Sequence, residues 1–331
     1  MEARARVFVT RRMLPEALEL IAAEADLEVW PEEHPPSPQQ LRGKVAVVQG
    51  VLTNIMDRVD TLLLEAAPEL KVVSQLGVGV DHIDVARATR QGILVGNTPG
   101  VLVGATADLA FALLMSAARR VGESERWLRA GKWIMAFHPM FWLGADIHQA
   151  TLGIIGLGQI GLEMAKRGRG FDMRVLYYSR TRKPELEARY GLEYADRAEL
   201  LRSADFVSLH VPLTPETHHY IAEEELRLMK PTAILINVAR GPVVDSSALY
   251  SALKEGWIRA AAMDVTDPEP MLPDDPLLTL ENLVVTPHIG SASEESRREM
   301  VLLAARNLLA GINGRRLEHC VNQELYEVKG I

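Results

Sequence analysis

The 331-residue sequence contains a single cysteine, Cys320, so no intrachain disulfide can form. A chain without disulfides fits a reducing compartment, and we expect a cytoplasmic protein. The first residues are charged and then strand-like, and they lack the long apolar region of a secretory signal. No run of about 18 apolar residues occurs either, so we expect no membrane-spanning helix.

An excess of positive charge is also missing. The formal net charge of -8 argues against broad nucleic-acid binding and confines any basic site to a local cluster. Metal-binding patterns are absent too, because His218 and His219 are adjacent rather than four residues apart and no H-E-x-x-H motif occurs. We therefore expect no nucleic acid, no membrane and no metal among the partners.

Apolar residues make up 48% of the chain, which is typical of a folded globular protein, and the length exceeds what one core usually supports. Apolar runs alternate with helix-like segments in two series, which predicts an α/β protein with two doubly wound parallel sheets. The first series predicts strands at 6–10, 45–49, 71–75 and 93–95, and helices at 15–25, 59–67 and 85–91.

The second series begins at Thr151 and has six expected strands, as in a dinucleotide-binding domain. The strands are expected at 152–156, 174–178, 205–211, 233–238, 260–264 and 283–286, and the helices at 160–170, 184–190, 196–202, 222–228 and 246–255. Two long helices are expected at 105–129 and 293–312, and residues 132–148 form an arm or loop.

A glycine motif, G-L-G-Q-I-G, follows the first strand of the second series. Gly156 permits a tight turn, Gly158 lets the backbone approach a pyrophosphate, and Gly161 lets helix and strand pack closely. The following helix presents unpaired N–H groups to phosphates. The alternative is a glycine-rich turn without a ligand, but the strand and helix around the motif favour dinucleotide binding.

A basic turn stands where an acid usually ends the next strand. NAD-binding domains place an Asp or Glu there to bind the ribose 2′-hydroxyl, and this chain has Ser179 instead. Ser179 removes the repulsion of a 2′-phosphate, Arg180 can bind that phosphate bidentately, and Arg182 or Lys183 can add charge. This pattern predicts that NADPH is preferred and NADH is also used; a solvated turn that tolerates either cofactor is the alternative.

Three polar side chains follow later strands of the second series. Arg240, Glu269 and His288 are all expected at carboxyl ends of strands, where an open parallel sheet binds its ligand. Arg240 can bind the carboxylate of a 2-oxo acid, and a protonated His288 can give a proton to the ketone oxygen. Glu269, if it lies beside His288, would favour the imidazolium. Each residue also has an ordinary structural explanation, so their order after the glycine motif carries the prediction.

The sequence resembles the D-isomer-specific 2-hydroxyacid dehydrogenase family over nearly its whole length, and glyoxylate/hydroxypyruvate reductases are the nearest branch. The resemblance rests on the glycine motif and on N-V-A-R-G at 237–241, D-V-T-D-P-E-P at 264–270 and P-H-I-G-S-A at 287–292. L-L-T-L-E-N at 277–282 and N-L-L-A-G at 307–311 also resemble the branch. It implies reduction of glyoxylate to glycolate, and of hydroxypyruvate to D-glycerate, with hydride from the nicotinamide.

The resemblance implies roles for individual residues. His288 would donate the proton, Arg240 and Glu269 would act beside it, and Asp264 would contact the nicotinamide carboxamide. The backbone amides of Val78 and Gly79 would bind the substrate carboxylate, and Leu52 would line the pocket. The implied cofactor-binding set is Gly156, Leu157, Gly158, Gln159, Ile160, Gly161, Ser179, Arg180, Thr181, Val238, Ala239, Arg240, Asp264, His288 and Gly290.

The family's domain order is implied as well. A cofactor domain at 101–290 would be inserted into a substrate domain made of 1–100 and 291–331. The chain would form a homodimer through the cofactor domain and the arm at 132–148. Two alternatives stay open: a reductase of bulkier or varied 2-oxo acids, and a dinucleotide-sensing protein without catalytic activity, because a fold alone does not determine function.

Overall fold

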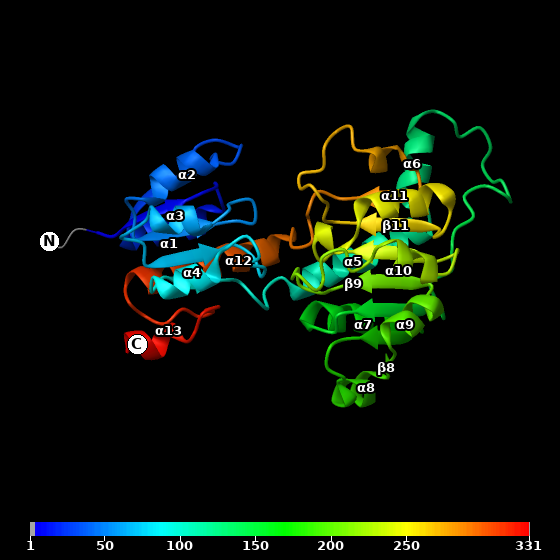
Figure 1. Cartoon of the computed structure of the whole chain (residues 1–331). Coiled ribbons are helices and arrows are strands. Elements are labelled where there is room, and N and C mark those ends of the chain that lie inside the picture. The colour runs from blue at the N-terminus through cyan, green and yellow to red at the C-terminus, as the bar shows by residue number, and fades with distance from the viewer. Residues whose placement is uncertain (1–3, 331) are drawn as a thin grey trace. The chain divides into compact units, whose positions relative to one another are not determined.

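The computed structural model describes residues 4–330, which divide into two compact units (Figure 1). Unit 1 comprises the residues up to Leu102 and those from Ser293 onward, so two separate stretches of chain build it. Unit 2 is the continuous stretch Val103–Ala292. No helix within residues 4–330 is long and apolar enough to cross a membrane.

Unit 1 contains a five-stranded parallel sheet with the order β2-β1-β3-β4-β5. The strands are β1 (Arg6–Val9), β2 (Asp26–Val29), β3 (Gly50–Thr53), β4 (Val72–Gln75) and β5 (Leu94–Gly96). The helices are α1 (Pro15–Glu24), α2 (Pro38–Val45), α3 (Thr61–Glu65), α4 (Val85–Arg90), α12 (Glu294–Ile312) and α13 (Leu325–Lys329).

The strands of unit 1 are apolar on both faces because helices cover both. Val7 and Val9 pack with Leu308 on the face that α1 and α12 cover. Phe8 points to the opposite face and packs with Leu63 and the other residues of α2, α3 and α4. Short polar side chains start several of these helices: Asp60 and Asp84, for example, accept hydrogen bonds from backbone amides of the first turns of α3 and α4.

Unit 2 contains a seven-stranded parallel sheet with the order β12-β11-β10-β9-β6-β7-β8. The strands are β6 (Thr151–Ile155), β7 (Arg174–Tyr178), β8 (Glu193–Tyr194), β9 (Phe206–Leu209), β10 (Ile234–Asn237), β11 (Ala260–Met263) and β12 (Leu283–Val285). The α-helices are α5 (Val103–Ala118), α6 (Val121–Arg129), α7 (Gln159–Gly170), α8 (Pro184–Tyr190), α9 (Arg197–Ser203), α10 (Glu223–Leu228) and α11 (Ser246–Glu255), and short 3₁₀ turns span Gly241–Val243 and Pro276–Thr279.

Helices cover both faces of this sheet as well. α5 and α7 pack on the face that includes Ile154 and Ala262, and α9, α10 and α11 pack on the face that includes Ile155 and Ala261. Both sheets are therefore doubly wound, which confirms the α/β fold expected from the alternating apolar runs. Chain order reverses between β1 and β3 in unit 1 and between β6 and β9 in unit 2. The carboxyl ends at such switch points are where open α/β sheets bind ligands.

The long helix expected at 105–129 is wrong in one respect, because the structure has two helices there. α5 ends at Ala118, α6 starts at Val121, and Arg120 between them has a left-handed φ of 54°. The Ala118 carbonyl accepts a hydrogen bond from the Ala145 amide (2.8 Å) instead of continuing a helix. The returning arm thus ends α5, an effect of chain positions that are far apart in sequence.

The strand expected at 45–49 is also wrong. Ser37 and Gln40 form a reciprocal capping box, so α2 begins at Pro38 and runs to Val45, and the strand lies at Gly50–Thr53. Two edge strands, β2 and β8, had no expectation at all. Residues 132–148 contain neither helix nor strand, as expected of an arm or loop.

Candidate active site

The glycine motif lies between β6 and α7, at the switch point of the unit 2 sheet. Gly156 has a φ of 98°, and a Cβ there would lie 2.7 Å from the carbonyl carbon of His210. A Cβ on Gly161 would lie 2.1 Å from the Gly156 oxygen. A Cβ on Gly158, in contrast, would meet nothing within 4 Å. The open space at Gly158, in front of the amides that begin α7, fits a dinucleotide pyrophosphate.

The other motif residues differ in exposure. Leu157 is buried in the core, so its carbonyl is the part that faces the neighbouring turn, where it accepts a hydrogen bond from Lys183 Nζ (2.6 Å). Gln159 is exposed and Ile160 is half-buried at the start of α7. The cofactor-binding roles of these side chains stay predictions.

The basic turn after β7 has a defined shape. Ser179 Oγ donates to the Thr181 carbonyl (2.7 Å), and Arg180 and Thr181 are exposed. Arg182, however, forms a two-point ion pair with Glu187 on α8, with nitrogen–oxygen distances of 2.9 and 2.8 Å. The sequence allowed either Arg182 or Lys183 to add charge for a phosphate. In the structure Arg182 is paired with an acid and Lys183 is directed to the glycine motif.

Asp264 follows β11 and has a structural task. Its carboxylate is 2% exposed and accepts hydrogen bonds from Thr286 Oγ1 (2.6 Å), the Ile289 amide (2.8 Å) and the Gly290 amide (2.7 Å). These bonds tie the turn that carries His288 to the end of the neighbouring strand. The contact of Asp264 with the nicotinamide carboxamide stays a prediction.

His288 and Glu269 lie side by side. His288 Nδ1 is 2.5 Å from Glu269 Oε1, and the side chains are 33% and 26% exposed. Glu269 Oε2 also accepts a hydrogen bond from the Thr266 amide (3.2 Å). The sequence left this pairing as a condition, and the structure brings the two residues together across 19 positions of chain.

The charge state of Glu269 follows from these neighbours. Burial by itself raises the pKa of Glu269, but the hydrogen bond and the charge of His288 lower it. The Thr266 amide and the charge of Arg240 act in the same direction, and the net pKa lies below its usual value. Glu269 is therefore a carboxylate at neutral pH that accepts the Nδ1 proton of His288, which leaves Nε2 as the other proton-carrying position of the ring.

Arg240 ends the turn after β10. Asn237, which is fully buried, accepts from the Ala239 amide (3.0 Å) and donates to the Arg240 carbonyl (2.9 Å), and so shapes the turn. Arg240 Nη1 donates to the Ala239 carbonyl (2.8 Å), and Val238 and Ala239 are each 9% exposed. Asn237 had no expected role, although an Asn at a strand end is a known turn former.

The residues expected to bind substrate in unit 1 lie within β3 and in the loop after β4. Val78, 39% exposed, and Gly79 follow β4, and within residues 4–330 neither of their amides donates a hydrogen bond. Asn97 Nδ2 donates to the Val78 carbonyl (2.9 Å) and holds this loop. Leu52 is 1% exposed and packs in the apolar core, so its side chain is not on an open surface of the unit.

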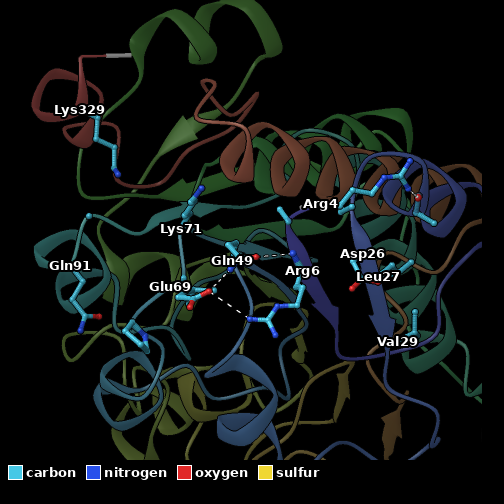
Figure 2. A pocket seen from close by; sticks show the side chains of 16 residues that line it. Arg4, Arg6, Asp26, Leu27, Val29, Gln49, Glu69, Lys71, Gln91 and Lys329 are labelled. Carbon is cyan, nitrogen blue, oxygen red and sulfur yellow. Dashed lines mark hydrogen bonds and ion pairs between the residues drawn. The ribbon is translucent and has the colours of Figure 1, made fainter. Parts of the chain in front are cut away.

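An open depression on unit 1 is not a candidate for the reaction. Figure 2 shows this open depression, into which Lys71 and Lys329 project and beside which Arg6 pairs with Glu69 (3.7 Å). It lies where β1, β2 and β4 begin, the opposite edge from the carboxyl ends that bind ligands in parallel sheets. Among the residues that the structure describes, no group of three or more metal-ligating side chains occurs.

Comparisons with known proteins identify the family. The family model for the NAD-binding domain of D-isomer-specific 2-hydroxyacid dehydrogenases matches residues 111–290. A glyoxylate reductase of Korarchaeum cryptofilum is 51% identical over 324 residues, covering 98% of each chain. A solved structure from Thermus thermophilus has a TM-score of 0.89 at 45% identity, covering 96% of this chain and 99% of that one.

One solved relative was determined with ligands. It is an NADPH-dependent glyoxylate/hydroxypyruvate reductase of Sinorhizobium meliloti in complex with NADP and malonate. Its TM-score is 0.86 at 31% identity, covering 97% of this chain and 98% of that one.

Proposed function

The chain belongs to the D-isomer-specific 2-hydroxyacid dehydrogenase family and is a nicotinamide-dependent oxidoreductase, and we propose that it reduces glyoxylate to glycolate. The observation that carries the proposal is the His288–Glu269 pair, 2.5 Å apart, in the same unit as the glycine motif. The name of the Sinorhizobium relative supports hydroxypyruvate as a second substrate.

His288 is the proposed proton donor. Since Glu269 accepts the Nδ1 proton, the protonated ring holds its second proton on Nε2, and that proton goes to the ketone oxygen of the substrate. Reduced nicotinamide, when bound, supplies the hydride to the substrate carbon. The negative charge of Glu269 stabilises the imidazolium before transfer and keeps the ring in one orientation.

Arg240 is the proposed carboxylate-binding residue. Its guanidinium is planar and always charged, so it suits bidentate recognition of a carboxylate and polarisation of the neighbouring ketone. Its turn is held by Asn237 on both sides, which limits the side chain to positions near the end of β10. The amides of Val78 and Gly79, which donate no hydrogen bond within residues 4–330, are proposed as further donors to the carboxylate.

NADPH is the proposed preferred cofactor, with NADH also used. The support is local: Ser179 replaces an acid at the end of β7, and Arg180 next to it is exposed. A 2′-phosphate at this place would find cationic and hydroxyl donors and no carboxylate of the type that binds a ribose 2′-hydroxyl.

A homodimer is proposed through unit 2 and the arm at 132–148. The arm exposes large apolar side chains, of which Ile134 is 91%, Phe137 78% and Met140 69% exposed. Monomeric proteins rarely expose apolar clusters of this kind, so a second copy is expected to cover them. We also propose a cytoplasmic location, because a chain with one cysteine needs no oxidising compartment.

The test is the initial rate of reduced-cofactor oxidation with glyoxylate, with NADPH and NADH in parallel. Turnover that is faster with NADPH supports both the reaction and the reading of the basic turn. Turnover that is faster with NADH keeps the reaction and refutes the cofactor preference. A chain that binds the reduced cofactor, yet does not oxidise it in the presence of any 2-oxo acid, would contradict the enzymatic function.

A further inference from the structure

The side chain of Lys183 connects two parts of unit 2 that the sequence separates by 26 residues. Its Nζ donates to the Leu157 carbonyl of the glycine motif (2.6 Å), and the side chain is half-buried. The backbone nearby is paired, because the Gly156 amide donates to the Tyr178 carbonyl (2.8 Å). Leu157 and Ser179 are the next residues after this pair. The Lys183 side chain therefore connects the turn after β7 to the glycine motif.

The neighbouring cation is neutralised. Glu187 on α8 pairs with Arg182 at two points and also accepts a hydrogen bond from the buried Tyr177 hydroxyl (2.7 Å). The hydrogen bonds from Arg182 and Tyr177 lower the pKa of Glu187 to about 2, so it is a carboxylate at any working pH. Arg182 further lies over the Tyr194 ring, 5.6 Å from its centroid. Its charge is therefore cancelled, and its side chain is held along α8.

The Lys183 charge is not cancelled in this way. Its partner is a neutral carbonyl, which occupies one of the three ammonium protons and leaves two donors. The Lys183 amide also donates to the Tyr177 hydroxyl (2.7 Å). The backbone of Lys183 therefore belongs to the same hydrogen-bond network in which Glu187 pairs with Arg182. The other cation of the turn, Arg180, is exposed, and its charge helps to lower the pKa of Glu216.

We propose that Lys183 binds the 2′-phosphate of NADPH and is a specificity-determining residue of the cofactor site. The inference rests on the proposed cofactor preference and adds a residue to it. Lys183 supplies a cation that is already in place at the glycine motif, whereas the exposed Arg180 must be ordered on binding. Glu187 contributes indirectly, because it withdraws Arg182 and so leaves Lys183 and Arg180 as the cations for the ligand.

The experiment measures dissociation constants for the full chain by titration, without turnover. The probes are adenosine 2′,5′-bisphosphate and 5′-AMP, which differ by the 2′-phosphate, followed by NADPH and NADH. Loss of one charged hydrogen bond in Lys183→Met is expected to weaken NADPH and the bisphosphate about tenfold, and NADH and AMP less than about twofold. Lys183→Arg keeps the charge and is expected to retain most of the preference.

Two further variants separate charge from structure. Lys183→Gln keeps an N–H donor but has no charge, so it should lose the preference as Lys183→Met does. Lys254→Met removes the same charge from an exposed lysine of unit 2 whose hydrogen bond goes to Tyr250, and it should bind all four probes like wild type. Thermal unfolding of each variant shows whether the fold is kept, and Lys183→Gln and Lys183→Arg decide the result if Lys183→Met does not fold.

An equal loss for NADPH and NADH in Lys183→Met would place Lys183 at the shared pyrophosphate and overturn the inference. A Lys183→Gln variant with wild-type preference would show that Lys183 has a structural role and does not determine the preference for NADPH. If wild type binds bisphosphate and AMP equally, the cofactor preference itself fails, and the inference fails with it. If wild type prefers the bisphosphate and Lys183→Met keeps that preference, the inference alone fails.

Discussion

The two parallel sheets of this chain have edges of different chemistry where we propose that ligands bind. At the edge of unit 2, ionisable side chains gather: His288 is hydrogen-bonded to Glu269, and Arg240 is close enough to lower the pKa of Glu269. At the edge of unit 1, the residues of interest are the backbone amides of Val78 and Gly79, held from behind by Asn97. The same architecture thus carries the proposed catalytic side chains in one unit and the proposed backbone donors in the other.

This difference predicts how each edge responds to mutation. A substitution removes the function of a side chain that transfers a proton or neutralises a charge. A backbone N–H donor, in contrast, remains whatever side chain its residue carries. Substitutions at the edge of unit 2 should therefore change turnover strongly. Substitutions around the loop of unit 1 should act through the position of the loop and change substrate binding modestly.

The largest effect is expected at His288. His288→Ala removes the proposed general acid and should lower turnover with glyoxylate by roughly 1000-fold, while the dissociation constant for NADPH stays close to wild type. Steady-state rates and cofactor titration measure the two quantities. His218→Ala is the matched control, because His218 is an exposed histidine of the same unit outside the proposed site. Near-normal turnover in His288→Ala would show that His288 is not the proton donor.

Glu269→Gln should have the next largest effect. It keeps the size of the side chain but removes the charge that stabilises the imidazolium, so turnover should fall by roughly 100-fold. Because the pKa of Glu269 is lowered, the wild-type carboxylate stays charged as pH falls from 7 toward its usual pKa, and the charge is lost only at lower pH. Rate–pH profiles of the two proteins test this. Glu223→Gln, on the surface of α10, should match wild type.

A half-buried histidine near the same edge should make unit 2 sensitive to acid. Burial lowers the pKa of His210 to about 3, and its Nε2 is 2.9 Å from Ser208 Oγ. The pKa of His210 is lower in the folded state than in the unfolded state. The free energy of unfolding is therefore unaffected by this group above about pH 6.5, and it decreases as the pH drops toward the folded-state pKa. At pH 5 the loss should be about 2 kcal/mol, or roughly 30-fold in the unfolding equilibrium.

Urea unfolding between pH 7 and 4 measures this dependence. His210→Asn removes the titrating group, so its unfolding free energy should depend less on pH, whatever its value at pH 7. A variant that loses stability with acid as steeply as wild type would assign the sensitivity to other groups.

The smallest effect is expected at Asn97. Asn97→Ala removes the hydrogen bond to the Val78 carbonyl, so the loop loses one constraint worth about 1 kcal/mol, and KM for glyoxylate should rise about fivefold. Turnover at saturating substrate should change little, since the proton donor is untouched. A large fall in kcat with unchanged KM would show that unit 1 takes part in the reaction step, and so would erase the difference between the two edges.

Local patterns predicted the elements with strong local signals. The helices at 184–190 and 246–255 and the strand at 174–178 match their predicted bounds, because Pro184, Asp245 and a continuous apolar run mark them. The break near Arg120 was not predictable, since its cause is the arm residue Ala145. The apolar run at 45–49 was misread as a strand because the end of α2 and the following turn are both apolar.

The site shows the same limit. Strand ends placed Arg240, Glu269 and His288 at one edge, but whether Glu269 touches His288 depends on the path of the loop between them. The choice between Arg182 and Lys183 depended on Glu187 of α8, which captures one of two chemically similar neighbours. Sequence spacing predicts which strand end a residue follows, whereas hydrogen-bond partners are decided by packing.

The most direct test of the central claim follows the hydride itself. NADPH that carries deuterium at the transferred position of the nicotinamide is incubated with the protein and glyoxylate, and the product is analysed by mass spectrometry and NMR. We expect glycolate with one deuterium on the hydroxyl-bearing carbon from wild type, and the same product at a roughly 1000-fold lower rate from His288→Ala. Glycolate without deuterium, or no glycolate from a wild-type protein that binds NADPH, would contradict it.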